Sequence, residues 1–221
     1  MQFKNVKNIL APLIKGGQRW QFININGKES KPRFYFSDVQ WALIAISILA
    51  LFRLEKGLSK EMIGYVISAF AISVSLFMSL LVSIFDKFEN TDLSIKGKTE
   101  EDLARLVQKK NFFKRFISIT SYLVVLSIFI IILCSLNYIF NLTNEISYHQ
   151  FASNFQKIDL LLTMKNSLTI GYRIVLNYFL MNYLLMTLFV ASSAYEYYIS
   201  EIDKRKISWH FSVSISWFHY N

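Results

Sequence analysis

The sequence contains few of the residues from which catalytic and metal sites are usually built. Its 221 residues include one cysteine, three histidines, seven glycines and two prolines. The single thiol, Cys134, excludes an intrachain disulfide, and the histidines do not stand at metal-ligand spacing. No G-x-S-x-G elbow, H-E-x-x-H helix, C-x-x-C pair or glycine-rich phosphate loop occurs. We therefore predict no enzyme activity, no metal site and no cofactor.

Long apolar segments, in contrast, are abundant. Four of them interrupt the chain, at residues 34–52, 62–85, 116–140 and 174–195. About 20 residues, each rising about 1.5 Å, carry a helix across the ~30 Å of hydrocarbon in a bilayer. The second, third and fourth segments contain no charged residue. The sequence therefore predicts a mainly α-helical membrane protein with four transmembrane helices surrounded by the lipid bilayer.

Basic residues are concentrated on one side of these segments. Residues 1–33, 86–115 and 196–221 contain 18 of the 24 lysines and arginines. Because cytoplasmic flanks collect lysine and arginine, both termini and the middle loop are predicted to be cytoplasmic, with residues 141–173 as an outer loop. The formal net charge of +9 is then a sign of topology, and direct nucleic-acid binding is not expected.

The compartment follows from targeting signals and composition. The first 33 residues are polar and basic and lack the apolar core of a cleavable signal peptide. Isoleucine, lysine, asparagine and phenylalanine are abundant, which resembles the product of an AT-rich bacterial genome. We place the chain in a bacterial inner membrane as a multi-pass protein.

The N-terminal 33 residues contain two different patterns. Residues 1–15 have the spacing of a basic amphipathic helix that lies on a membrane surface, interrupted by Pro12. Residues 19–36 then indicate a hairpin around Asn26 and Gly27, because both residues tolerate positive φ. Two strands alone are marginal in water, so this hairpin requires a third element.

The C-terminal tail is predicted to supply that element. From residue 207 to residue 217 apolar and polar side chains alternate, which is the period of a strand with one apolar face. The tail is then expected to complete a small cytoplasmic sheet, or to bind a partner protein by strand addition. The largest side chains on its apolar face are the candidate partner-binding residues Trp209, Phe211 and Trp217.

The middle loop, residues 86–115, reads as a charged helical hairpin. Gly97 breaks the helix, and Thr99 is a candidate N-cap for the next one. The acidic residues that follow Thr99 lie in the first turn, where the helix dipole favours negative charge.

The second apolar segment carries six small residues on one helical face. Their spacing is 4, 3, 4, 4 and 4 residues, over the whole depth of a bilayer. Small residues let helices approach closely, and serine hydroxyls can bond across the contact. Alternatively, serine hydroxyls replace part of the hydration shell of an ion, so the same face can line a narrow aqueous path. These six residues, the seam, are Gly64, Ser68, Ala71, Ser75, Ser79 and Ser83.

Asparagine amides in the third and fourth segments require partners, because hydrocarbon offers none. We predict contacts between helices or subunits for Asn177 and Asn182, with Asn137 near the same level as a candidate partner.

A four-span chain with basic cytoplasmic ends, a charged helical loop at residues 98–115 and no enzyme motif resembles the membrane subunits of bacterial anti-phage defence operons of the Kiwa, Hailong and retron types. The resemblance covers the whole chain as an outline. It rests on no family motif, so it carries over no functional residue. It implies a channel, a membrane-permeabilising effector or a membrane sensor, usually oligomeric and held by a cytosolic partner.

Two functions remain in view. The first is an oligomeric membrane pore, ion-channel-like or permeabilising, controlled by a cytosolic protein or ligand. A homo-tetramer is favoured, because the four helices of one chain are too few to enclose a path. The alternative is a non-conducting sensor or scaffold that recruits a cytosolic effector. The row of serines favours the pore, and the amount of cytoplasmic sequence favours regulated binding.

Overall fold

The computed structural model describes residues 3–23, 27–30, 36–53, 57–91, 99–140 and 160–217, and this part of the chain is all-α. Its five helices are α1 (Phe3–Trp20), α2 (Asp38–Arg53), α3 (Lys60–Glu89), α4 (Glu100–Phe140) and α6 (Leu160–Trp217).

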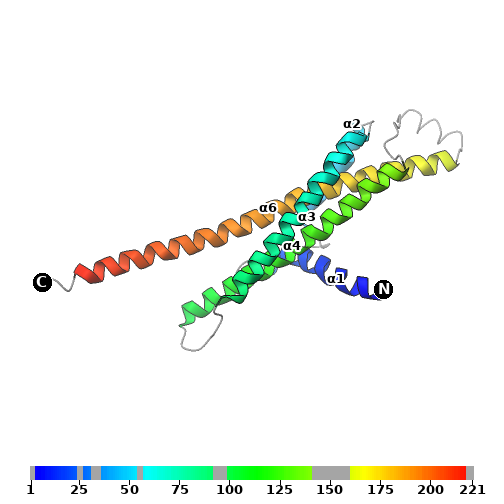
Figure 1. Cartoon of the computed structure of the whole chain (residues 1–221). Helices are drawn as coiled ribbons and strands as arrows, with labels where there is room; N and C mark the ends of the chain where they lie inside the picture. The colour runs from blue at the N-terminus through cyan, green and yellow to red at the C-terminus, as the bar shows by residue number, and fades with distance from the viewer. Residues whose placement is uncertain are drawn as a thin grey trace.

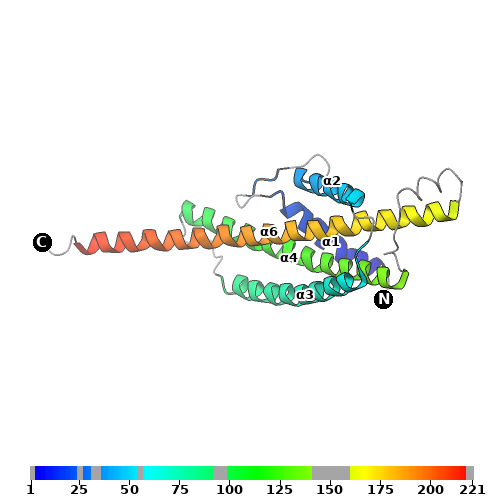
Figure 2. The same ribbon diagram turned by 90° about the horizontal axis from the view of Figure 1, so that it is seen from above.

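Three long helices form the centre of the fold. Helices α3 and α6 both pack against α4 and run antiparallel to it, while α6 continues far beyond the other two (Figures 1 and 2). Helix α2 lies along α6, and α1 packs against α4 and leaves the bundle sideways. Since α4 touches three of the other four helices, it is the element around which the core assembles.

Helices α3, α4 and α6 are each long and apolar enough to cross a membrane. Helix α2, within the first predicted span, is shorter. Its 16 residues extend about 24 Å, less than the ~30 Å of a hydrocarbon core. The predicted outer loop is also shorter than residues 141–173, because α6 already begins at Leu160.

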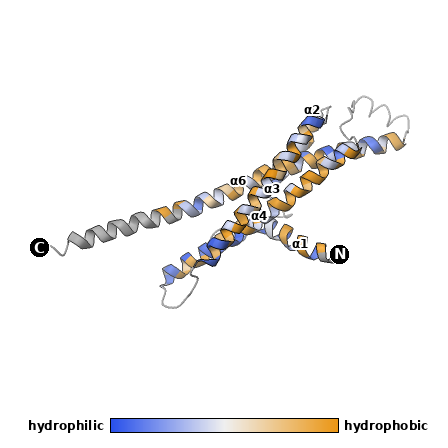
Figure 3. Cartoon of the chain, viewed as in Figure 1, coloured by the Kyte–Doolittle hydropathy of each residue, from blue (hydrophilic) through white to orange (hydrophobic). Residues whose placement is uncertain are grey.

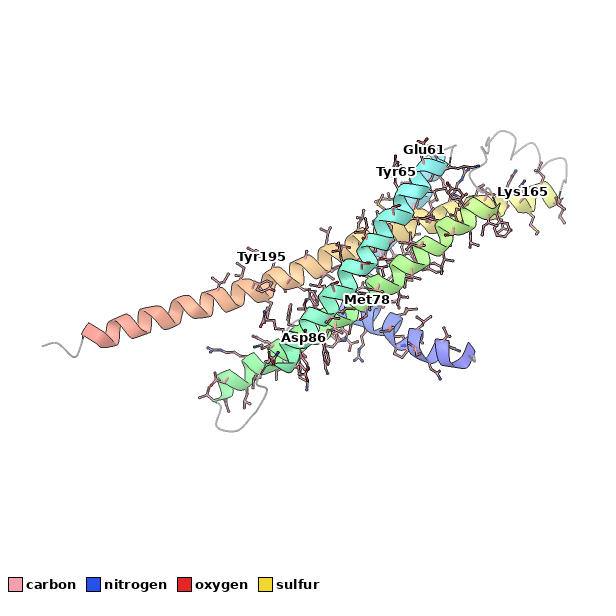
Figure 4. All side chains as sticks on the ribbon, viewed as in Figure 1. Glu61, Tyr65, Met78, Asp86, Lys165 and Tyr195 are labelled. Atoms are coloured by element: carbon pink, nitrogen blue, oxygen red, sulfur yellow. The ribbon has the colours of Figure 1, made fainter. Side chains whose placement is uncertain are left out.

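The ends of the bundle are polar and its middle is apolar (Figure 3). Glu61 and Lys165 mark one end, and Asp86 marks the other, where α3 ends and α4 begins (Figure 4). At that second end α4 starts as predicted: Thr99 Oγ1 accepts a hydrogen bond from the backbone N of Asp102 at 3.3 Å. The second arm of the predicted charged hairpin is helical and continues without a break into the third apolar segment as one 41-residue helix, while Gly97, the predicted break, lies outside the described residues.

Aromatic side chains hold the three long helices together. Phe70 of α3 meets Tyr183 of α6 edge to face, with ring centroids 4.6 Å apart. Phe88 of α3 meets Phe113 of α4 in the same way at 5.2 Å. Phe112 of α4 stacks on Tyr197 of α6 at 4.2 Å. Such pairs contribute about 0.5–1.5 kcal/mol each beyond the burial of their area.

The predicted C-terminal strand is wrong. Residues 207–217 continue α6, which runs without interruption to Trp217. Nucleating a helix is costly, whereas extending one adds a hydrogen bond for each residue that is fixed. A strand, in contrast, gains its hydrogen bonds only from a neighbouring strand, and the described residues contain none. Trp209, Phe211 and Trp217 therefore lie on a helix, and the expected sheet between the two ends of the chain does not form.

Within the described residues, the predicted N-terminal hairpin is represented by one antiparallel bridge between Ile23 and Glu29, and residues 24–26 and 31–35 of the prediction lie outside them. Gly27 adopts φ +79°, the positive value expected of it. The first predicted strand is displaced because α1 continues past Pro12 to Trp20. An ion pair of 3.0 Å joins Arg19 at the end of α1 to Glu29 and closes the turn. The Glu29 carboxylate raises the pKa of the Arg19 guanidinium, chiefly through this hydrogen bond.

Candidate functional site

The seam of small residues faces away from the rest of the protein. Helix α3 packs against its neighbours through one side, on which Ile63, Phe70 and Ile84 are buried. The five seam residues from Ser68 to Ser83 are exposed, and a Cβ built on Gly64 would meet no atom within 4 Å. Only 6% of the apolar part of α3 is buried, against 50% in α4 and 28% in α6. The seam is therefore available to another copy of the chain.

One seam hydroxyl, that of Ser79, bonds back to its own helix. Ser79 Oγ donates to the backbone oxygen of Ser75 at 3.1 Å, one turn earlier in the same helix. This bond satisfies the hydroxyl hydrogen and leaves both lone pairs of the Ser79 oxygen as acceptors. The seam thus presents a narrow polar track, flanked by apolar side chains such as Leu76, which is 65% exposed.

A second polar feature lies inside the bundle, at the start of α2. Ser37 and Gln40 form a reciprocal capping box: Gln40 N donates to Ser37 Oγ at 3.2 Å, and Ser37 N donates to Gln40 Oε1 at 3.0 Å. The box fixes the Gln40 side chain, which is almost fully buried. Its Nε2 donates to Asn182 Oδ1 of α6 at 3.1 Å and to Gln21 Oε1 at 3.3 Å.

Further hydrogen bonds connect the Gln40–Asn182 pair to α4 and to α1. Asn182 Nδ2 donates to the hydroxyl of Tyr122 in α4 at 3.5 Å, and Gln21 Nε2 donates to the backbone oxygen of Gly17 in α1 at 3.4 Å. We call the four side chains, Gln21, Gln40, Tyr122 and Asn182, the amide junction. Hydrogen bonds between helices in a membrane contribute about 0.6–2 kcal/mol each. The junction therefore fixes α1, α2, α4 and α6 relative to one another.

Sequence reasoning selected Asn182 but missed the other three residues of the amide junction. The S-x-x-Q pattern at residues 37–40 is a capping-box signature, and it identifies Gln40 as a residue at a helix start. Nothing in the local sequence indicates that Gln40 would meet Asn182, which lies 142 residues later.

The other two asparagines have different surroundings. Asn137 is buried on α4, whereas the Asn182 amide bonds to Gln40 and Tyr122, so the predicted contact of Asn137 with Asn182 does not form within the chain, and a contact between subunits stays a prediction. Near Asn137, the hydroxyl of Tyr172 donates to the backbone oxygen of Leu133 at 2.8 Å and ties α6 to α4. Asn177 is half-buried on α6.

Helix α1 approaches α4 at Gly17. A Cβ built on Gly17 would lie 2.6 Å from Tyr122 Cγ and closer still to Tyr122 Cβ, which is too near for any side chain. A Cβ on the adjacent Gly16 would lie 3.8 Å from Ser118 Oγ, an ordinary contact. Gly17 thus permits the close packing that brings the end of α1 to the amide junction.

We expect Gly17→Ala to destabilise the docking of α1 by about 1–3 kcal/mol, because the added methyl overpacks the contact with Tyr122. Gly16→Ala is the matched control and is expected to be neutral or slightly stabilising, since alanine favours a helix. Thermal unfolding in mild detergent measures both variants. Equal melting temperatures for the two would show that α1 does not depend on this approach.

Charged groups mark the polar end of the bundle, where all three long helices meet. Glu196 of α6 lies 3.9 Å from Arg115 of α4, so this carboxylate has a basic neighbour. The Lys87 ammonium of α3 lies over the rings of Tyr197 and Tyr198, at 5.8 and 5.3 Å from their centroids.

Comparison with known proteins assigns this chain to no family. A scan against protein-family models, a search of curated proteins and a search of solved structures each gave no match.

Proposed function

We propose that this chain is a subunit of an oligomeric membrane pore, lined by the seam of α3 and controlled from the cytoplasmic side. Four spans with both ends in the cytoplasm and a tetrameric assembly in a bacterial inner membrane remain part of this proposal. In this proposal α2 is the fourth span. Because it is shorter than the hydrocarbon core, the bilayer becomes thinner around it, or flanking residues complete the crossing.

The observation that carries the proposal is the outward direction of the seam. Small residues that served packing within one chain would face α4 or α6, yet these face away from both. A lipid tail gains nothing from a serine-rich face, so a neighbouring copy or an aqueous path is the better surrounding. Converging copies of α3 would place Ser68, Ser75, Ser79 and Ser83 around a common axis.

In this proposal the amide junction and α6 are the elements through which a cytosolic partner or ligand opens or closes the pore. The junction links the N-terminal helix to α2, α4 and α6, so a change at the N-terminus would act on the packing of the bundle. Helix α6 has 58 residues, far more than a membrane span needs, and its C-terminal part projects from the bundle (Figure 1). That projection offers a cytosolic protein a long helical surface.

The same projection favours the alternative, a non-conducting scaffold or sensor that recruits a cytosolic effector. Both functions require self-association, but only the pore requires conductance. The outline resemblance to membrane subunits of anti-phage defence operons fits either one, with membrane permeabilisation as the output of the first.

Two measurements on the purified protein distinguish the two functions: its oligomeric state and its permeability to a small dye. We expect an oligomer, most simply a tetramer, by mass photometry in mild detergent, and release of a small trapped dye from vesicles that contain it. Oligomers without dye release would support the scaffold. A monodisperse monomer would overturn both.

A further inference from the structure

Helix α1 carries one apolar stripe, of which the protein uses only half. The second half of the stripe, with Leu13, Ile14 and Trp20, is partly buried, and Ile14 and Trp20 pack against the core next to Gly17. The first half, with Val6 and Ile9, overhangs the bundle, and the Ile9 side chain is 59% exposed. Both halves lie on the same face of the helix, so whatever surrounds α4 at this level also reaches the overhang.

The position of α1 along α4 indicates what that surrounding is. Its contacts, Ser118 and Tyr122, lie directly after the basic run of α4 that ends at Arg115 and at the start of the uncharged residues 116–140. In a membrane helix this transition marks the headgroup region. Helix α1 therefore leaves the bundle at the depth of the lipid headgroups.

Charge selects the kind of lipid. Outside the apolar stripe of α1, the exposed Lys7 and Lys15 side chains would lie at the level of the headgroups. Each basic residue near an anionic membrane surface contributes about 1 kcal/mol of attraction. A zwitterionic surface would give the lysines no net charge to meet.

We propose that the overhanging half of α1, around Val6, Ile9 and Leu10, binds anionic lipid at the membrane surface, with Lys7 and Lys15 selecting the negative headgroups. This inference rests on insertion of the bundle in a bilayer and does not require a pore. Because the other half of α1 is fixed to Tyr122 and to the amide junction, lipid binding would hold the start of the chain against α4.

A single fluorescent reporter tests the proposal. Cysteine replaces Ile9 in a Cys134→Ala background and carries an environment-sensitive dye. The full chain is then reconstituted in phosphatidylcholine vesicles with or without phosphatidylglycerol. We expect emission to shift to the blue when phosphatidylglycerol is present, and the shift to be lost after Lys7→Glu with Lys15→Glu. A dye at position 8, on the polar side of the helix, is the matched control and should not shift.

Three results would overturn the proposal. The first is identical emission from position 9 in both kinds of vesicle. The second is a shift that follows the protein-to-lipid ratio instead of lipid charge, which would assign the overhang to a second copy of the chain. The third is a shift that survives the two charge reversals. Dye release from the same vesicles reports separately on the pore, so failure of one proposal does not obscure the other.

Discussion

Replacing Ser79 with leucine is expected to stop dye release from vesicles while the oligomer stays intact. Ser79 lies on the exposed seam of α3, where its oxygen keeps free acceptor sites. In a pore lined by this face, the leucine side chain removes the acceptor and fills the path with an apolar group, which gates by excluding water. The expected loss is complete, down to the leakage of protein-free vesicles.

The matched control is Ser73→Leu. Ser73 lies on α3 outside the seam, and its hydroxyl also bonds back within the helix, to the backbone oxygen of Ala69 at 2.9 Å. The two substitutions therefore remove the same kind of hydrogen bond and add the same volume. Normal leakage for Ser73→Leu with none for Ser79→Leu supports the pore. Dissociation of the Ser79→Leu oligomer would instead show that the seam is a packing contact.

Breaking the amide junction is expected to give the largest loss of stability. Asn182→Leu removes the acceptor of Gln40 and the donor to Tyr122, and leaves a buried Gln40 amide with one bond fewer. An unsatisfied buried polar group costs about 1–3 kcal/mol, and each lost inter-helix bond adds about 0.6–2 kcal/mol. Thermal unfolding in detergent should report a lower melting temperature and a broader transition as α2 separates from α6.

A double-mutant cycle isolates the contact itself. Gln40→Leu combined with Asn182→Leu should cost less than the two single changes added together, because the second change no longer leaves an orphaned amide. Asn177→Leu, on another face of α6, is the control for placing leucine in this helix and should cost little. Strict additivity of Gln40→Leu and Asn182→Leu would contradict the coupling seen in the structure.

The parts of the fold predicted from the sequence are those set by local chemistry. Apolar runs without charge identify the helices, since backbone groups in an apolar setting must be satisfied within the segment. The Thr99 cap and the positive φ of Gly27 follow from single residues. The six-residue seam followed from periodicity alone, although its outward direction required knowledge of which side of α3 is buried.

The errors come from long-range competition. Alternation in residues 207–217 satisfies the strand pattern, but a strand needs a partner and a helix does not, so α6 continues to Trp217. Helix α1 contains Pro12 and extends to Trp20, beyond the predicted residues 1–15. The amide junction brings together residues from four segments, and no local pattern encodes which buried amides meet.

The reactivity of a cysteine at position 79 tests whether the α3 seam lines a pore. Ser79→Cys in a Cys134→Ala background is reconstituted in a planar bilayer and exposed to a small, charged, water-soluble thiol reagent during current recording. If the α3 seam lines the pore, the current falls on reaction and returns when a reducing agent removes the adduct, whereas Ser73→Cys gives no response. An assembled protein in which the cysteine at position 79 does not react, with an unchanged current, would show that the seam does not line the pore.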